Sequence, residues 1–196
     1  MTVTATLMSL EDFFAHTDDT DTLYELENGE LLAMPPESDL NQRIASFLFA
    51  YFLRQGISHD CLRMKTEVAV SGARVTVRLP DLLLLSEELV IALGEATRST
   101  VTLDMPPPQL VVEVVSPGKQ NRDRDYRYKR SQYEARSIGE YWIVDPIAQQ
   151  VTVLVLVEGL YEATVLEGET VIRSPLLTAL KSGHELTAAQ VLGAGA

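Results

Sequence analysis

The chain is poor in the residues that build disulfides and thiolate metal sites. Its 196 residues include one cysteine and three histidines. A single cysteine excludes an intramolecular disulfide and a zinc site built on cysteines. Apolar runs long enough to cross a bilayer are also absent, and no signal-peptide pattern opens the sequence. We therefore expect a cytoplasmic protein that makes no membrane contact.

Positive charge is scarce overall but concentrated in one segment. The formal net charge is −12, which disfavours non-specific affinity for nucleic acid, because that affinity comes mainly from neutralising phosphates. Between Lys119 and Arg136, however, seven basic residues stand against three acidic ones. Because the charge is segregated, an enzyme acting on nucleic acid is not excluded. With 46% hydrophobic and 22% charged residues, the composition is typical of one globular domain over residues 1–196.

The order of helix and strand patterns predicts an α+β protein. Asn28-Gly29 is the preferred turn pair of a β-hairpin, here over 24–34. Apolar residues at helical spacing, preceded by Ser38 as N-cap, predict a helix over about 38–54. The further expected elements are strands at about 62–70, 75–85 and 109–116, a helix at about 122–137, a strand at 141–144, a β meander with strands at 151–157, 161–166 and 169–172, and a short helix near 187–192.

Two carboxylates interrupt otherwise apolar strands. Glu113 lies within the run 110–116, which is typical of a strand buried on both faces, and Asp81 opens the run 80–85. Burying an unpaired carboxylate costs on the order of several kcal/mol. If the two strands are neighbours, both acids can point to one side and hold Mg²⁺, a hard ion that takes oxygen ligands. Together with the basic helix that follows, the two acids indicate phosphodiester chemistry.

Each acid also has a purely structural interpretation. Asp81 can be a turn residue that follows a proline, and Glu113 can form a structural ion pair with a nearby arginine. If the two acids do share a partly dry cleft, their like charges repel. Without a metal, we then expect at least one of the two carboxyls to have a raised pKa.

Six strings in a fixed order carry a resemblance to a known family. They are Tyr24-Glu-Leu-x-x-Gly-Glu30, Met34-Pro-Pro36, Pro80-Asp81, Pro108-x-Leu-Val-Val-Glu-Val-x-Ser-Pro117, Asp125-x-x-x-Lys129-x-x-x-Tyr133 and Glu140-Tyr-Trp-Ile-Val-Asp-Pro146. They resemble the Uma-type family of bacterial restriction endonucleases, assigned to the PD-(D/E)XK superfamily, over about residues 20–175. The resemblance implies a restriction-endonuclease-like core (helix, three strands, helix, strand) at about 38–146, with an N-terminal hairpin and a C-terminal β meander. It also implies a magnesium-dependent nuclease site, with Mn²⁺ as the alternative ion.

The superfamily signature has a lysine two residues after the acid, where this chain has Val115. The helix that follows offers a replacement. Tyr126, Lys129 and Tyr133 fall on one helical stripe, so that Lys129 is expected to face the two acids and stabilise developing charge. The alternatives are a lysine that extends its ammonium into water, and an i,i+4 ion pair with Asp125.

The resemblance suggests further site residues. Glu25 and Glu30 flank the hairpin turn, and one of them is expected to reach the metal as a third acid. We favour Glu30, because apolar residues follow it, although both can be exposed hairpin carboxylates. Arg122 and Arg130 are candidates for binding DNA phosphates, and their alternative is a solvated helix face. The family commonly has histidine where this chain has Asn41, so any role of that histidine is absent or altered here.

Three functions compete. The first is a metal-dependent DNA endonuclease with Asp81, Glu113 and Lys129 as catalytic residues and Asp81, Glu113 and Glu30 as metal ligands. The second is a degenerate nuclease-fold protein that binds nucleic acid or a protein partner without cleavage, as the missing lysine and the acidic net charge suggest. The third is an unrelated acid-rich structural protein. A nuclease that cuts both strands would gain from two-fold symmetry, so a homodimer through the apolar meander is also considered.

Overall fold

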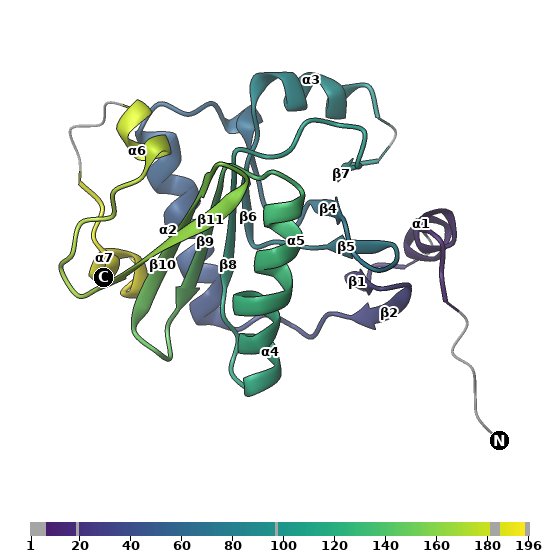
Figure 1. The fold of residues 1–196 in the computed structure, drawn as a ribbon, viewed down its shortest axis with the longest axis horizontal. Coiled ribbons are helices and arrows are strands. Elements are labelled where there is room, and N and C mark those ends of the chain that lie inside the picture. Colours follow the sequence, from purple (N-terminus) through teal and green to yellow (C-terminus); the bar gives the residue numbers. More distant parts are fainter. Residues whose placement is uncertain (1–6, 19, 97, 181–184, 195–196) are drawn as a thin grey trace.

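The computed structural model describes residues 7–18, 20–96, 98–180 and 185–194. These residues form a large and a small β-sheet with helices around them, which confirms the predicted α+β class (Figure 1).

The large sheet runs through the middle of the molecule (Figure 1). Its strands, in spatial order, are β11 (Leu160–Glu167), β10 (Gln150–Val157), β9 (Glu140–Asp145), β8 (Leu110–Val114), β6 (Leu82–Leu84) and β3 (Leu62–Arg63). Strands β8 and β9 are parallel, and the other neighbours are antiparallel. The Val-rich strand β8 is buried along its whole length, because elements cover both of its faces.

The small sheet is built from the N-terminal half of the chain. Its order is β2 (Glu30–Ala33), β1 (Tyr24–Glu27), β5 (Thr76–Arg78), β4 (Glu67–Val70) and β7 (Thr100–Val101). The predicted hairpin is confirmed: Asn28 and Gly29 have φ values of 51° and 86°, as a type I′ turn requires. Helix α1 (Leu10–Asp18) packs Phe13 against the apolar side of this sheet.

Helices cover both faces of the large sheet. On one face lie α2 (Asp39–Arg54), α6 (Pro175–Ala179) and α7 (Ala188–Leu192), and the other carries α4 (Lys119–Asp123), a π turn (Arg124–Lys129) and α5 (Arg130–Ala135) (Figure 1). Helix α3 (Glu87–Gly94) packs at the end of the molecule above β7. The hydroxyl of Ser38 accepts a hydrogen bond of 3.1 Å from the Asn41 amide, so Ser38 caps α2 as predicted.

Two predicted strands each divide between the two sheets. The run 62–70 forms β3 in the large sheet and β4 in the small one, separated by Lys65, whose φ is 52°. The run 75–85 likewise forms β5 and β6, separated around Pro80, which has no N–H to donate to a ladder. The prediction of two continuous strands was wrong, because apolar patterning does not reveal that a strand changes sheet. The division creates the corner in which Lys65 and Asp81 meet.

The helix predicted over 122–137 contains the π turn, which changes the residues that face the sheet. Asp125 is buried beside Lys129, whereas Tyr126 is half-buried and donates its hydroxyl to Asp145. The stripe expected from regular winding was therefore partly wrong.

At the C-terminal end, the strand expected at 169–172 was wrong: Val171 makes only an isolated bridge to Thr187. The short helix expected near 187–192 is confirmed as α7. The patterns did not predict α3 and α6.

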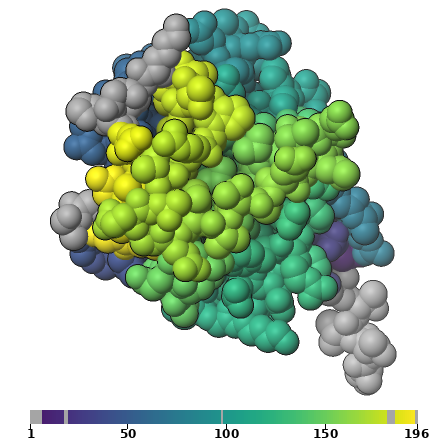
Figure 2. All heavy atoms as spheres, turned by 60° about the vertical axis from the view of Figure 1, so that its left-hand side comes forward, coloured from purple at the N-terminus to yellow at the C-terminus, as the bar shows by residue number. Residues whose placement is uncertain are grey.

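The surface of the meander is visible in Figure 2, where β10 and β11 cross the face that is turned forward. Strand β11 is an edge of the large sheet and exposes Leu160 and Val165. The homodimer expected from this surface stays a prediction. None of the helices within the described ranges has the length and apolar character to cross a membrane.

Candidate active site

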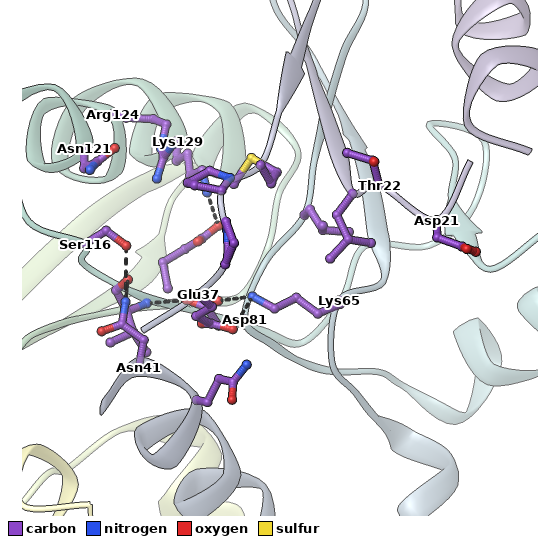
Figure 3. A pocket seen from close by; sticks show the side chains of 18 residues that line it. Asp21, Thr22, Glu37, Asn41, Lys65, Asp81, Ser116, Asn121, Arg124 and Lys129 are labelled. Carbon is purple, nitrogen blue, oxygen red and sulfur yellow. Dashed lines mark hydrogen bonds and ion pairs between the residues drawn. The ribbon is translucent and has the colours of Figure 1, made fainter. Parts of the chain in front are cut away.

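A cavity of about 660 Å³ opens where β8, the start of β6, the 34–37 segment and the first turn of α2 approach the π turn (Figure 3). Its lining includes all three side chains that the sequence predicts as catalytic, Asp81, Glu113 and Lys129. The antiparallel register pairs Leu82 with Val112, and it therefore continues with Asp81 beside Glu113. Strand pairing thus brings together two acids that lie far apart in the sequence.

Asp81 is buried and holds two partners. Its Oδ2 accepts a hydrogen bond of 2.7 Å from the Val114 amide, which ties it to the strand that carries Glu113. Its Oδ1 lies 2.6 Å from the ammonium of Lys65. Asp81 does lie in a bend directly after Pro80, as its structural interpretation expects, and its carboxylate also joins the segments that carry Lys65 and Val114.

Glu113 and Lys129 form a buried ion pair. The Lys129 Nζ lies 2.7 Å from Glu113 Oε1, which also accepts a 2.7 Å hydrogen bond from the hydroxyl of Tyr133. Lys129 Nζ lies 3.8 Å from Asp125, so that pair is the longer of the two. The lysine does not extend into solvent, since 1% of its side chain is exposed. The helix-borne lysine therefore faces the acids, and the partner of Glu113 is a lysine rather than an arginine.

The hairpin acid that contacts Lys129 is Glu25, from β1, although Glu25 is not among the residues that line the cavity. Its carboxylate lies 3.1 Å from Lys129 Nζ and 2.9 Å from the buried Arg78 guanidinium, and it accepts a hydrogen bond from the Leu79 amide. Glu30, which we favoured from the sequence, is exposed and does not line the cavity. The hairpin register pairs Glu27 with Glu30 and Glu25 with Leu32, so Glu25 and Glu30 lie on the same face of the small sheet. Burial distinguishes Glu25 from Glu30 where apolar neighbours did not.

Burial and charge give these groups different acidities. Burial raises the pKa of Glu113 to about 7, with Lys129 opposing the shift and Asp125 and Asp81 adding to it. This confirms the expectation of one raised carboxyl. Burial alone would also raise the pKa of Glu25, but Lys129 and Arg78 outweigh it and lower the pKa to about 2. Burial disfavours the charge of Lys129, yet Glu113 and Glu25 raise its pKa above the ordinary value, so the ammonium stays charged.

Asn41 connects α2 to the end of β8. Its Nδ2 donates to the Val114 carbonyl at 3.3 Å and to the Ser116 hydroxyl at 3.2 Å, and the residue is buried at the cavity wall. A neutral amide in this place can donate to backbone and hydroxyl at once, but it cannot exchange a proton near neutral pH as a histidine does.

Lys65 and Glu37 also line the cavity, and the sequence reasoning missed both. Lys65 Nζ bridges Asp81 and Glu37, the latter at 3.0 Å (Figure 3). Burial and the neighbouring Asp81 raise the pKa of Glu37. A lysine inside a predicted strand, and an acid between two prolines and a helix cap, were the available signals. Neither indicates a site unless the division of the strand at Lys65 is known.

The predicted phosphate-binding arginines lie outside the cavity. Arg130 donates to the Tyr161 carbonyl at 3.1 Å and so fastens α5 to β11. Arg122 is exposed, lies 3.6 Å from Asp145 and stacks over the Tyr126 ring. The arginine that does line the cavity is Arg124, in the π turn (Figure 3).

The fold is that of a solved nuclease-like protein. The crystal structure of a protein from Anabaena variabilis, described as a "putative nuclease belonging to DUF820", superposes with a TM-score of 0.68 over 96% of this chain and 99% of that chain, at 13% sequence identity. An identity this low shows the fold alone, and the α+β arrangement fits the restriction-endonuclease-like core predicted from the sequence. The model of the family Uma2, described as "Putative restriction endonuclease", matches residues 10–189. The chain therefore belongs to the Uma2 family. No curated protein sequence matches it.

The donor set fits a hard divalent cation as a two-carboxylate site. Within the described ranges, no three Asp, Glu, His or Cys side chains converge closely enough to hold a metal ion by themselves. Mg²⁺ does not need such a cage, because it commonly binds one or two carboxylates and completes its shell with water and substrate phosphate. Asp81, directly before β6, and Glu113, in the neighbouring β8, line one cavity and supply that minimum.

Proposed function

We propose that this protein is a metal-dependent DNA endonuclease that hydrolyses phosphodiester bonds, with Asp81, Glu113 and Lys129 as its catalytic residues. The observation that carries the proposal is the contact of 2.7 Å between Lys129 and Glu113, in the cavity that Asp81 also lines. Membership of a family described as restriction endonucleases supports it. Lys129 in the helix takes the place of a lysine at position 115. The site therefore has an ammonium group although the signature lysine is missing.

Asp81 and Glu113 would hold Mg²⁺ or Mn²⁺. When bound, such an ion polarises a phosphate and lowers the pKa of a water molecule. The chain's own contribution is to orient the acids. The Val114 amide holds Asp81, and Tyr133 together with Lys129 holds Glu113. Lys129 can stabilise negative charge that develops on the phosphate, and Glu25 keeps it in place.

DNA would enter from the side of the π turn. Arg124 lines the cavity, and the exposed Arg122 is next to it on the helix, so both can contact phosphates beside the bond that is cut. Because the rest of the chain is acidic, we expect modest binding that weakens steeply with salt.

The test is cleavage of supercoiled plasmid with Mg²⁺ or Mn²⁺, with and without chelator. The wild type should nick or cut, and Glu113→Gln should be inactive, since a neutral amide is a poor ligand for a hard cation. Glu162→Gln, at an exposed position of β11, is the matched control that carries the same substitution through the same purification. Cleavage that is equal in the Glu113→Gln and Glu162→Gln proteins would come from a contaminant and would refute the proposal.

A second candidate is a nuclease-fold protein that binds DNA without cutting it. The specific observation in its favour is that each acid is already paired with a lysine, Asp81 with Lys65 and Glu113 with Lys129. Salt-dependent DNA binding without any metal-dependent cleavage would establish this candidate in place of the first.

A further inference from the structure

Two lysines line the cavity, and they differ in how freely the ammonium group can move. Lys129 has 1% of its side chain exposed and lies among Glu113, Glu25 and Asp125. Lys65 has 31% of its side chain exposed and contacts Asp81 and Glu37, its two acidic partners. The Lys129 ammonium cannot leave without exposing buried acids to one another, whereas the Lys65 ammonium can move along a path that is open to water.

The position of Lys65 depends on an unusual backbone conformation. Its φ of 52° lies in the left-handed region that residues other than glycine rarely adopt. This turn separates β3 from β4 and directs the side chain into the corner between the two sheets. There its Nζ lies 2.6 Å from Asp81 Oδ1, on the carboxylate that would bind the divalent cation.

We infer that Lys65 is a built-in competitor for the divalent cation: it neutralises Asp81 until the cation displaces it, and Glu37 then retains the displaced ammonium. This inference rests on the proposed cation site. The Lys65 ammonium already contacts Asp81 Oδ1, and the Val114 amide contacts Oδ2, so a divalent cation on this carboxylate has to compete with a positive charge that is in place. Glu37 already lies 3.0 Å from Lys65 Nζ, so the ammonium keeps one acidic partner when it leaves the other.

The expected consequence is that Lys65 lowers the affinity for the cation. Lys65→Met should bind Mn²⁺ on the order of tenfold more tightly than the wild type, because hydrogen bonds to charged groups contribute about that factor. Lys65→Gln, which keeps a donor but loses the charge, should shift the affinity in the same direction. The matched control is Lys119→Met, which removes one exposed lysine from the chain without touching either acid.

Glu37 should act mainly through Lys65. In the wild-type background, Glu37→Gln removes the place to which the ammonium moves, so Mn²⁺ binding should weaken several-fold. In the Lys65→Met background, the same Glu37→Gln substitution should have a much smaller effect, because only the direct interaction of Glu37 with Asp81 is then lost. A ligand to the metal would behave differently, since its loss weakens binding whether or not Lys65 is present.

The experiment is calorimetric titration of the full chain with Mn²⁺ alone, without DNA, with Asp81→Asn as the variant that lacks the site. Tighter binding in both Lys65 variants, together with an effect of Glu37→Gln that is much smaller in the Lys65→Met background, supports the inference. Equal or weaker binding in Lys65→Met and Lys65→Gln, relative to Lys119→Met, overturns it while the cation site stands. An equal effect of Glu37→Gln in both backgrounds overturns the part assigned to Glu37. Mn²⁺ binding that Asp81→Asn does not abolish refutes the proposed cation site itself.

Discussion

Lys129 and Glu113 meet at 2.7 Å although one lies in a helix and the other in the middle of a buried strand. Either charge would be costly to bury here without the other. The helix supplies the charge that the strand lacks at position 115, and the same contact positions both groups at the cavity wall.

Lys129→Met is expected to destabilise the fold by roughly 3–5 kcal/mol, because it leaves buried carboxylates without their common cation. Lys119→Met, at an exposed position, should change the free energy of unfolding by less than about 0.5 kcal/mol. Adding Glu113→Gln to Lys129→Met should recover part of the loss, since it removes one of the unpaired charges. Urea denaturation of the four proteins measures this, and a Lys129→Met protein as stable as the control would contradict the buried ion pair.

Stability without metal should fall as pH rises from about 4.5 to about 7. The pKa of Glu113 is raised from 4.5 to about 7, so in this window the folded state binds a proton that the unfolded state has lost. The difference is on the order of 3 kcal/mol and is fully present as a penalty above the folded pKa. Burial also raises the pKa of Asp125 and Glu37, which act in the same direction.

The contribution of Glu113 to this pH dependence is therefore measured by comparing a Glu113 variant with a control variant. In chelator, Glu113→Gln should show a smaller fall in melting temperature over this pH range than Glu162→Gln. Parallel pH profiles would mean that Glu113 titrates normally. Glu25 does not interfere, because its lowered pKa moves its own effect to the window between about 4.5 and 2.

Arg78 joins the small sheet to α5, and its loss should be severe. The guanidinium is fully buried, and it contacts Glu25 at 2.9 Å and donates its Nε–H to the Gln132 side-chain oxygen at 2.9 Å. Arg78→Met should cost roughly 3–5 kcal/mol. Arg74→Met, at an exposed position just before β5, is the control and should be nearly neutral. Hydrogen exchange should report early opening of the β1–β2 hairpin in Arg78→Met, and unchanged protection there would contradict this role.

Substitution of Arg124 should affect DNA binding, whereas substitution of Arg130 should affect stability. Measured by fluorescence anisotropy on the inactive Glu113→Gln protein, Arg124→Ala should weaken DNA binding and lower the salt slope by about one. Arg130→Ala should leave the slope unchanged and instead lower stability by roughly 1–3 kcal/mol, because it frees the Tyr161 carbonyl. If Arg130→Ala were the variant with the smaller slope, the assignment from the sequence would be right and ours wrong.

The sequence was sufficient for the residues whose position follows from strand alternation. Asp81 and Glu113 were expected on one face with the leucines and valines two residues away, and those neighbours do share one apolar layer. A buried acid in an apolar run is costly, so it stands out in the sequence.

The residues that the sequence did not reveal depend on how the chain turns between elements. Lys65 reaches Asp81 because one apolar run belongs to two sheets, and the break of three residues, 64–66, turns at Lys65, whose φ is positive. Neither periodicity nor composition contains that information. The choice between Glu25 and Glu30 failed for a related reason, because both acids lie on the same face of the hairpin and only the packing of the small sheet buries Glu25 against Arg78.

The π turn makes the site sensitive to the length of the chain as well as to its side chains. Such a turn arises where a helix accommodates one residue more than regular winding allows. If all the residues of this segment wound regularly instead, Lys129 would be rotated relative to α4 by about 100°. Deleting one residue between 124 and 128 would let the helix wind regularly and would keep the direction of Lys129. A relative of equal length whose helix winds regularly can therefore retain Asp81, Glu113 and Lys129 and yet have lost the contact between the helix and the strand, whereas a relative with a one-residue gap here can keep it.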